Sequence, residues 1–166
     1  VALFVVYPYC KRFTWLAHVV LGASTAGAPV GGYLAVAGHW DAAAVVLGLV
    51  VVTWMAGFDI LYALMDMDHD RAHGLRSIPQ RFGIPVSLLI SDAFHVLTAA
   101  LLVATGVVAS LHWPFYVFAV AAAALLVAFR ALPVVALVAT TGARDFALGL
   151  RAPLVGPALR LSLLTT

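Results

Sequence analysis

Long apolar stretches separated by short polar connections dominate this sequence. They cover about 13–37, 42–65, 84–111 and 114–138, and a weaker stretch follows. A helix needs roughly 20 apolar residues to cross a bilayer, so each of the four is long enough to span one. The pattern therefore predicts an all-α, polytopic transmembrane helical bundle with about five or six spans.

The composition supports a membrane protein and excludes several other classes. The chain is 64% hydrophobic and 10% charged, whereas about a quarter of the residues in a soluble domain are charged. We therefore interpret 1–166 as a single membrane domain. The single Cys10 excludes an internal disulfide and a thiolate metal cage. The basic residues are spread along the connections, which argues against a nucleic-acid partner.

The two ends of the chain differ from the middle. The sequence begins at Val1 with an apolar stretch and has no signal-peptide pattern, so we interpret it as a portion that starts inside a larger membrane protein. The segment 131–166 lacks a clean 20-residue apolar window, because Arg and Asp interrupt it. We predict that this segment is an atypical tail, truncated or read out of frame.

Lys and Arg occur in every second connection between the predicted spans. If the spans follow one another, Lys and Arg fall on one side of the membrane, at Lys11, Arg12, Arg71, Arg76, Arg81 and Arg130. The connections on the other side contain His and Trp but neither Lys nor Arg. By the positive-inside rule, the basic side is cytoplasmic.

Acidic residues gather where the second full span ends. Four of the seven acidic residues are Asp59, Asp66, Asp68 and Asp70, and the chain has no Glu. Carboxylates beside a membrane core are costly unless they are solvated, paired or bound to a cation. Steps of seven and four place Asp59, Asp66 and Asp70 on one stripe if the helix continues that far. Hard oxygen ligands in this pattern favour Mg²⁺ bound together with substrate phosphates.

Each candidate site also has a plainer interpretation. An isolated DxxxD is more often a solvated loop with internal ion pairs, although Asp59 lies too far inside the span for that explanation. Tyr7 and Lys11, four apart, could bind one phosphate or could be an interfacial anchor. Asp92 and His95 could contact substrate in a central cavity, or they could be an acid near a helix start and a packed histidine.

Three stretches in this order resemble the UbiA family of intramembrane aromatic prenyltransferases, especially its 4-hydroxybenzoate polyprenyltransferase-like branch. They read YPYCKRFTWLAHVVLG, PVGGYLAVAG and WMAGFDILYALMDMDHDRAHGLRSIPQRFG, and the resemblance covers roughly 7–94. It implies that Asp66 and Asp70 form the second Asp-rich motif, which binds Mg²⁺ and diphosphate. It also implies that Tyr7 and Lys11 form the YxxxK motif near the diphosphate.

The resemblance assigns the remaining roles as well. Arg76 matches a basic position that follows the acids and would bind the diphosphate, while Asp59 and Tyr62 match polar positions of the preceding helix. Asp59 joins the two motif aspartates in the catalytic set, and Tyr62, Asp92 and His95 are weaker candidates for contacts with the acceptor in the cavity. The first Asp-rich motif of the family is absent, so we expect the chain alone to be inactive without the N-terminal half of the same protein.

The implied activity is transfer of a polyprenyl group from a prenyl diphosphate to an aromatic acceptor such as 4-hydroxybenzoate, in ubiquinone or menaquinone biosynthesis. The partners would be these two substrates, Mg²⁺ and the lipid bilayer. We expect a multi-pass protein of the bacterial inner membrane with its site loops in the cytoplasm. The alternative is an ion-coupled transporter whose Asp59 and Asp66 line a cation path. A transport site should lie near the midplane on broken helices, whereas these acids gather at one end.

Overall fold

The computed structural model describes residues 2–125 and 127–128, and all regular secondary structure in these residues is helical. The helices are α1 (Ala2–Phe13), α2 (Ala17–Ala37), α3 (Ala42–Met65), α4 (Met67–Ala72) and α5 (Ile78–Val108), followed by a shorter apolar helix, Trp113–Leu125. The five numbered helices belong to one compact unit, Val1–Tyr116, and the description below concerns this unit.

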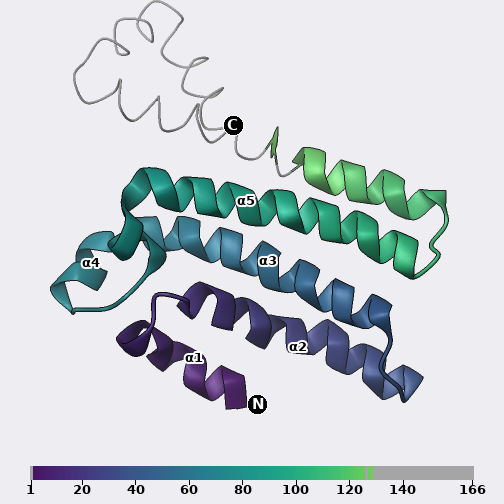
Figure 1. Ribbon diagram of the computed structural model, residues 1–166, viewed down its shortest axis with the longest axis horizontal. Helices are drawn as coiled ribbons and strands as arrows, with labels where there is room; N and C mark the ends of the chain where they lie inside the picture. Colours follow the sequence, from purple (N-terminus) through teal and green to yellow (C-terminus); the bar gives the residue numbers. More distant parts are fainter. Residues whose placement is uncertain (1, 126, 129–166) are drawn as a thin grey trace, which may run out of the picture. The chain divides into compact units, whose positions relative to one another are not determined.

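The helix α3 lies between α2 and α5, and α1 packs against α2 (Figure 1). Each of α2, α3 and α5 is long and apolar enough to cross a membrane. The prediction of an all-α membrane bundle is therefore confirmed, and the chain is an integral membrane protein. The predicted span 114–138 and the weaker stretch after it extend outside the described residues.

Small and polar side chains let the three long helices approach closely. A methyl group on Gly22 of α2 would overlap the backbone of Val52 in α3, whose Cα would be only 2.9 Å away. The Ser91 hydroxyl of α5 donates a 2.8 Å hydrogen bond to the carbonyl oxygen of Gly57 in α3. The two hydroxyls of Thr53 and Thr98 lie 2.8 Å apart across the same interface. Small residues and interhelical hydrogen bonds are what hold helices together in lipid.

The connection predicted over 66–83 contains more helix than expected. It holds α4 and the first turn of α5, which begins at Ile78 because the Ser77 side chain caps it by accepting from the Gln80 N–H at 3.4 Å. Gly83 then interrupts α5 with φ +75°, a conformation that glycine adopts without strain. The expected acidic stripe is also broken, because α3 ends at Met65 and Asp66 joins it to α4.

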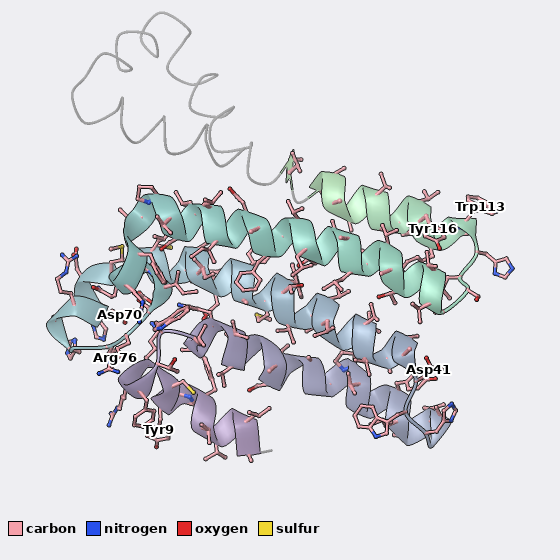
Figure 2. All side chains as sticks on the ribbon, viewed as in Figure 1. Tyr9, Asp41, Asp70, Arg76, Trp113 and Tyr116 are labelled. Carbon is pink, nitrogen blue, oxygen red and sulfur yellow. The ribbon has the colours of Figure 1, made fainter. Side chains whose placement is uncertain are left out.

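The connections alternate between two ends of the unit. Figure 2 shows Asp70 and Arg76 at the same end as Tyr9, and Asp41 and Trp113 at the other. Lys11, Arg76 and Asp70 thus share one end, as the alternation along the sequence predicted for them, whereas Arg130 lies outside the described residues. The assignment of that end to the cytoplasm stays a prediction.

Candidate active site

An ion pair joins the two motifs that the sequence predicted. The Lys11 ammonium, near the end of α1, lies 3.2 Å from Oδ1 and 3.0 Å from Oδ2 of Asp70 in α4. These residues are 59 positions apart in the sequence. The Asp70 side chain is 1% exposed and that of Lys11 is 25% exposed. A buried carboxylate needs such a partner. Lys11 therefore neutralises Asp70, while part of the Lys11 side chain remains exposed to solvent.

Arg76 attaches the loop after α4 to the end of α1. Its backbone N–H donates to the Lys11 carbonyl at 2.6 Å, and its Nη1 donates to the Phe13 carbonyl at 2.9 Å. The carbonyls in the last turn of a helix have no intrahelical partner, and a cation there also suits the helix dipole. The guanidinium has five N–H donors, and the Arg76 side chain is exposed. It can therefore keep this bond and still present donors to an anion.

Asp59 has a partner that the sequence analysis did not identify. Its Oδ2 lies 2.7 Å from Nδ1 of His18, a residue in the first turn of α2 that is fully buried. The other ring nitrogen of His18, Nε2, accepts from the backbone N–H of Ile78 at 3.3 Å. The Asp59 side chain itself is 21% exposed. One imidazole thus connects α2 with both α3 and α5.

Tyr7 lies close enough to Asp59 for the two side chains to interact electrostatically. Burial, and secondarily the negative charge of Asp59, raise the pKa of Tyr7 above its ordinary value, so its hydroxyl keeps its proton at neutral pH. Helix α1 continues through Pro8, which places Tyr7 one turn before Lys11 as the spacing predicted. Tyr7 of α1 therefore lies near Asp59 of α3, and Lys11 follows one turn later on α1, where it contacts Asp70 of α4.

The three weaker candidates from the sequence are on α3 and α5. Tyr62 is 65% exposed on α3. His95 is buried between α3 and α5, where its Nδ1 lies 2.7 Å from the Ser91 carbonyl oxygen and its ring meets that of Phe58 edge to face at 5.0 Å. Asp92 is half-buried on the same helix. The packing of His95 explains its burial without a ligand, so a contact of these three residues with substrate stays a prediction.

The carboxylates at this end suit a metal that is shared with a phosphate. Asp66 and Asp70 are one turn apart, since the Asp70 N–H donates to the Asp66 carbonyl at 2.8 Å, and Asp66 is exposed. Among the described residues, no three His, Cys, Asp or Glu side chains gather as a metal-binding group. Mg²⁺ commonly binds through one or two carboxylates together with substrate phosphates and water. Carboxylate oxygens of this kind suit Mg²⁺ shared with a diphosphate, and the assignment of Asp66 and Asp70 as its protein ligands stays a prediction.

Comparison with known proteins decides the family. The model of the UbiA prenyltransferase family matches residues 1–150. The chain belongs to this family. The 4-hydroxybenzoate octaprenyltransferase of Enterobacter sp. (strain 638) is 34% identical over 125 residues, which are 75% of this chain and 43% of that protein. The protein of the same name from Pseudomonas aeruginosa (strain LESB58) is 35% identical over 127 residues, 76% of this chain and 43% of its own length. No solved structure gives a significant match.

Membership of the UbiA family confirms the resemblance seen in the motifs. A prenyltransferase family favours an enzyme over the transporter alternative, and prenyltransferases of this family generally use a divalent metal ion. The chain spans about two-fifths of the length of these curated relatives. The family match includes 131–150, part of the predicted atypical tail. That segment lies outside the described residues, and its interpretation as truncated or out of frame stays a prediction, as does the missing N-terminal half.

Proposed function

We propose that the protein containing this chain transfers a polyprenyl group from a prenyl diphosphate to an aromatic acceptor of the 4-hydroxybenzoate type, in quinone biosynthesis. The observation that carries the proposal is the meeting of Lys11 with Asp70 at 3.0 Å, beside the loop that Arg76 fastens to α1. It brings a cationic and an anionic motif from distant parts of the sequence to one end of the bundle. An Mg²⁺–diphosphate group needs both kinds of charge.

The diphosphate would bind at this end. Lys11 and Arg76 would donate to its oxygens while each keeps its contact within the protein, and the protonated Tyr7 hydroxyl would donate one more hydrogen bond. Arg suits this role because its planar fork matches phosphate oxygens in pairs. Mg²⁺, held by Asp66 and Asp70, would neutralise charge on the leaving diphosphate. Donors already in place where negative charge develops are the main source of rate in such a site.

The acceptor would bind on the Asp59 side of the cluster. When the C–O bond of the prenyl diphosphate breaks, its electron pair leaves with the diphosphate, and a ring carbon of the acceptor forms the new C–C bond to the allylic carbon. The ring proton is then transferred to water. Asp59, fixed by His18 and partly exposed, would orient the acceptor through a hydrogen bond to its hydroxyl. We place the diphosphate end on the cytoplasmic face of a bacterial inner membrane, on the positive-inside rule.

The test compares two neighbouring aspartates. Asp66→Asn removes one predicted metal-directed charge, and Asp68→Asn removes the same charge two positions further along the chain; both positions are exposed. In the protein expressed from its full coding sequence, prenyl transfer to 4-hydroxybenzoate is measured while Mg²⁺ is titrated. We expect Asp66→Asn to lose most activity at every Mg²⁺ concentration or to require far more Mg²⁺. Asp68→Asn should behave like the wild type.

Two results would contradict the proposal at different levels. Equal activity of the Asp66→Asn and wild-type proteins over the Mg²⁺ titration would remove Asp66 from the metal site. Absence of transfer to any aromatic acceptor by the folded wild-type protein would reject the aromatic prenyltransferase assignment. Activity with another aromatic acid but not with 4-hydroxybenzoate would correct only the acceptor.

A further inference from the structure

His18 is a fully buried ionisable residue to which none of the predicted roles was assigned. It lies in the first turn of α2, and its two ring nitrogens contact two different helices: Nδ1 lies 2.7 Å from Oδ2 of Asp59 in α3, and Nε2 lies 3.3 Å from the backbone nitrogen of Ile78 in α5. A buried polar side chain inside a membrane span is costly unless its hydrogen bonds are made. Both nitrogens of His18 have a partner.

The two contacts fix the tautomer of His18. A backbone N–H can only donate, so Nε2 must carry a lone pair to accept from Ile78. The proton of the neutral ring is then on Nδ1, where it points to the Asp59 carboxylate. Each contact therefore has a defined direction, and the ring cannot rotate without losing both.

Each ring nitrogen of His18, with its hydrogen bond, forms one arm that contacts a different part of the proposed site. The Nδ1 arm fixes one oxygen of Asp59, the carboxylate on the acceptor side. The Nε2 arm satisfies Ile78, whose N–H is one of the first four in α5 and has no partner inside the helix. Ile78 follows Arg76 by two positions, and Arg76 is fastened to α1 by its own two hydrogen bonds. The Nε2 arm thus secures the far end of the Arg76 loop.

We propose that His18 is a positioning residue. It holds Asp59 and the Arg76 loop, residues 73–77, at a fixed separation, so that the acceptor ring carbon lies opposite the allylic carbon of the prenyl diphosphate. This role rests on the function proposed above. His18 itself touches neither substrate, because it is fully buried. Its effect on the reaction passes through the two groups that it orients.

The two arms can be separated by substitution. His18→Asn keeps an amide near the position of Nδ1 and can still donate to Asp59, but it is too short to reach Ile78. His18→Gln is longer and can donate to Asp59 with its amide nitrogen while its oxygen accepts from Ile78. His18→Leu removes both bonds. His39→Asn is the control, because His39 is an exposed histidine two positions beyond the opposite end of α2.

The variants are made in the protein expressed from its full coding sequence and reconstituted in lipid nanodiscs. The KM for each substrate is measured, together with deuterium exchange of the backbone over residues 73–80, which needs no activity. Loss of one hydrogen bond corresponds to a change of about 3- to 10-fold in the affected KM and in the rate of deuterium exchange. His18→Asn should speed exchange and raise the KM for prenyl diphosphate by this factor, with the acceptor KM unchanged. His18→Leu should raise both KM values, and His18→Gln should restore both to within about 3-fold.

Different outcomes overturn different claims. If His18→Asn speeds exchange but leaves both KM values at the wild-type level, the contact is only structural and the positioning role is wrong, while the proposed function stands. If deuterium exchange over 73–80 is unchanged in His18→Leu, then the His18–Ile78 hydrogen bond, called the tether here, does not hold this loop. A double variant, His18→Asn with Arg76→Ala, should have the same diphosphate KM as Arg76→Ala alone, and a further rise would show that His18 does not act through Arg76. An inactive wild-type protein would reject the reaction and this role together, although exchange would still test the tether.

Discussion

The Lys11–Asp70 ion pair allows a quantitative prediction. Lys11→Met leaves the Asp70 carboxylate, 1% exposed, without its cation. Removing one partner of a fully buried pair costs about 3–5 kcal/mol, whereas an exposed pair contributes about 0–1 kcal/mol. The Lys11 side chain is 25% exposed, so solvent screens part of the interaction. We expect Lys11→Met to lower the free energy of unfolding by about 2–3 kcal/mol.

Asp70→Asn should cost less, about 1–2 kcal/mol, because the amide oxygen can still accept from Lys11 and the ammonium can reach water. The double variant carries no buried charge at this position. Its loss should therefore be smaller than the sum of the single losses, with a coupling energy of about 1–2 kcal/mol. Arg12→Met is the matched control, since Arg12 is the exposed neighbour of Lys11 and its removal should cost at most about 0.5 kcal/mol.

The assay is equilibrium unfolding of the full protein in mixed micelles, with increasing denaturing detergent and tryptophan fluorescence as the signal. The four variants and the wild type give a complete double-mutant cycle with its control. Additive losses in the double variant would refute the reasoning, because they would mean that Lys11 and Asp70 do not stabilise each other. A loss in Arg12→Met equal to that in Lys11→Met would likewise indicate a general effect of charge at the end of α1.

Two further predictions concern packing and protonation. Gly22→Ala should destabilise the protein by about 1–3 kcal/mol in the same unfolding assay, because its methyl group would overlap the Val52 backbone. Gly32→Ala should be neutral or stabilise by up to about 1 kcal/mol, because its methyl group would meet nothing within 4 Å beyond the neighbouring backbone of its own helix. Equal effects of the two substitutions would refute the close approach of α2 and α3. Asp59→Asn should lower the raised pKa of Tyr7 toward 10.0 without reaching it, because burial is the larger cause, as ultraviolet difference titration against Tyr7→Phe would measure. The stability that neutral Tyr7 contributes is complete below its ordinary pKa and is lost as pH rises through the raised pKa. An unchanged Tyr7 titration in Asp59→Asn would refute the proximity of the two side chains.

The sequence predicted the three long helices well because membrane-spanning length and apolar character are local properties. It did not predict where α5 begins. That boundary depends on the Ser77 cap and on the contact of Ile78 with His18, and the second of these comes from a helix 60 positions away. The acidic stripe failed because it required a helix that continues beyond the predicted apolar stretch 42–65, whereas α3 ends at Met65 and Asp66 joins it to α4.

The sequence predicted which charged residues gather at this end of the bundle, but not which of them pair. The sequence predicted that Lys11 and Asp70 lie at one end of the bundle, each with its own contact to the Mg²⁺–diphosphate group. The structure adds that the two side chains bind each other. His18 was missed because a single histidine in an apolar run has no motif. The signal that could have found it is Asp59: a carboxylate inside a span needs a partner, and His18 and His95 are the histidines that lie within predicted spans. Only tertiary packing distinguishes between them.

These pairings suggest unequal roles for the two motif aspartates. The Asp70 carboxylate already has a cation from within the chain on both of its oxygens, and a metal ion bound there must share it with Lys11. Among the described residues no ion pair holds Asp66, and its side chain is exposed. We infer that Asp66 is the first carboxylate available to Mg²⁺, while Asp70 mainly places Lys11 beside the diphosphate. Asp66→Asn should then shift the Mg²⁺ dependence at an unchanged stability, and Asp70→Asn should raise the KM for prenyl diphosphate and lower stability together. The opposite assignment of these two phenotypes would show that Asp70 is the principal metal ligand.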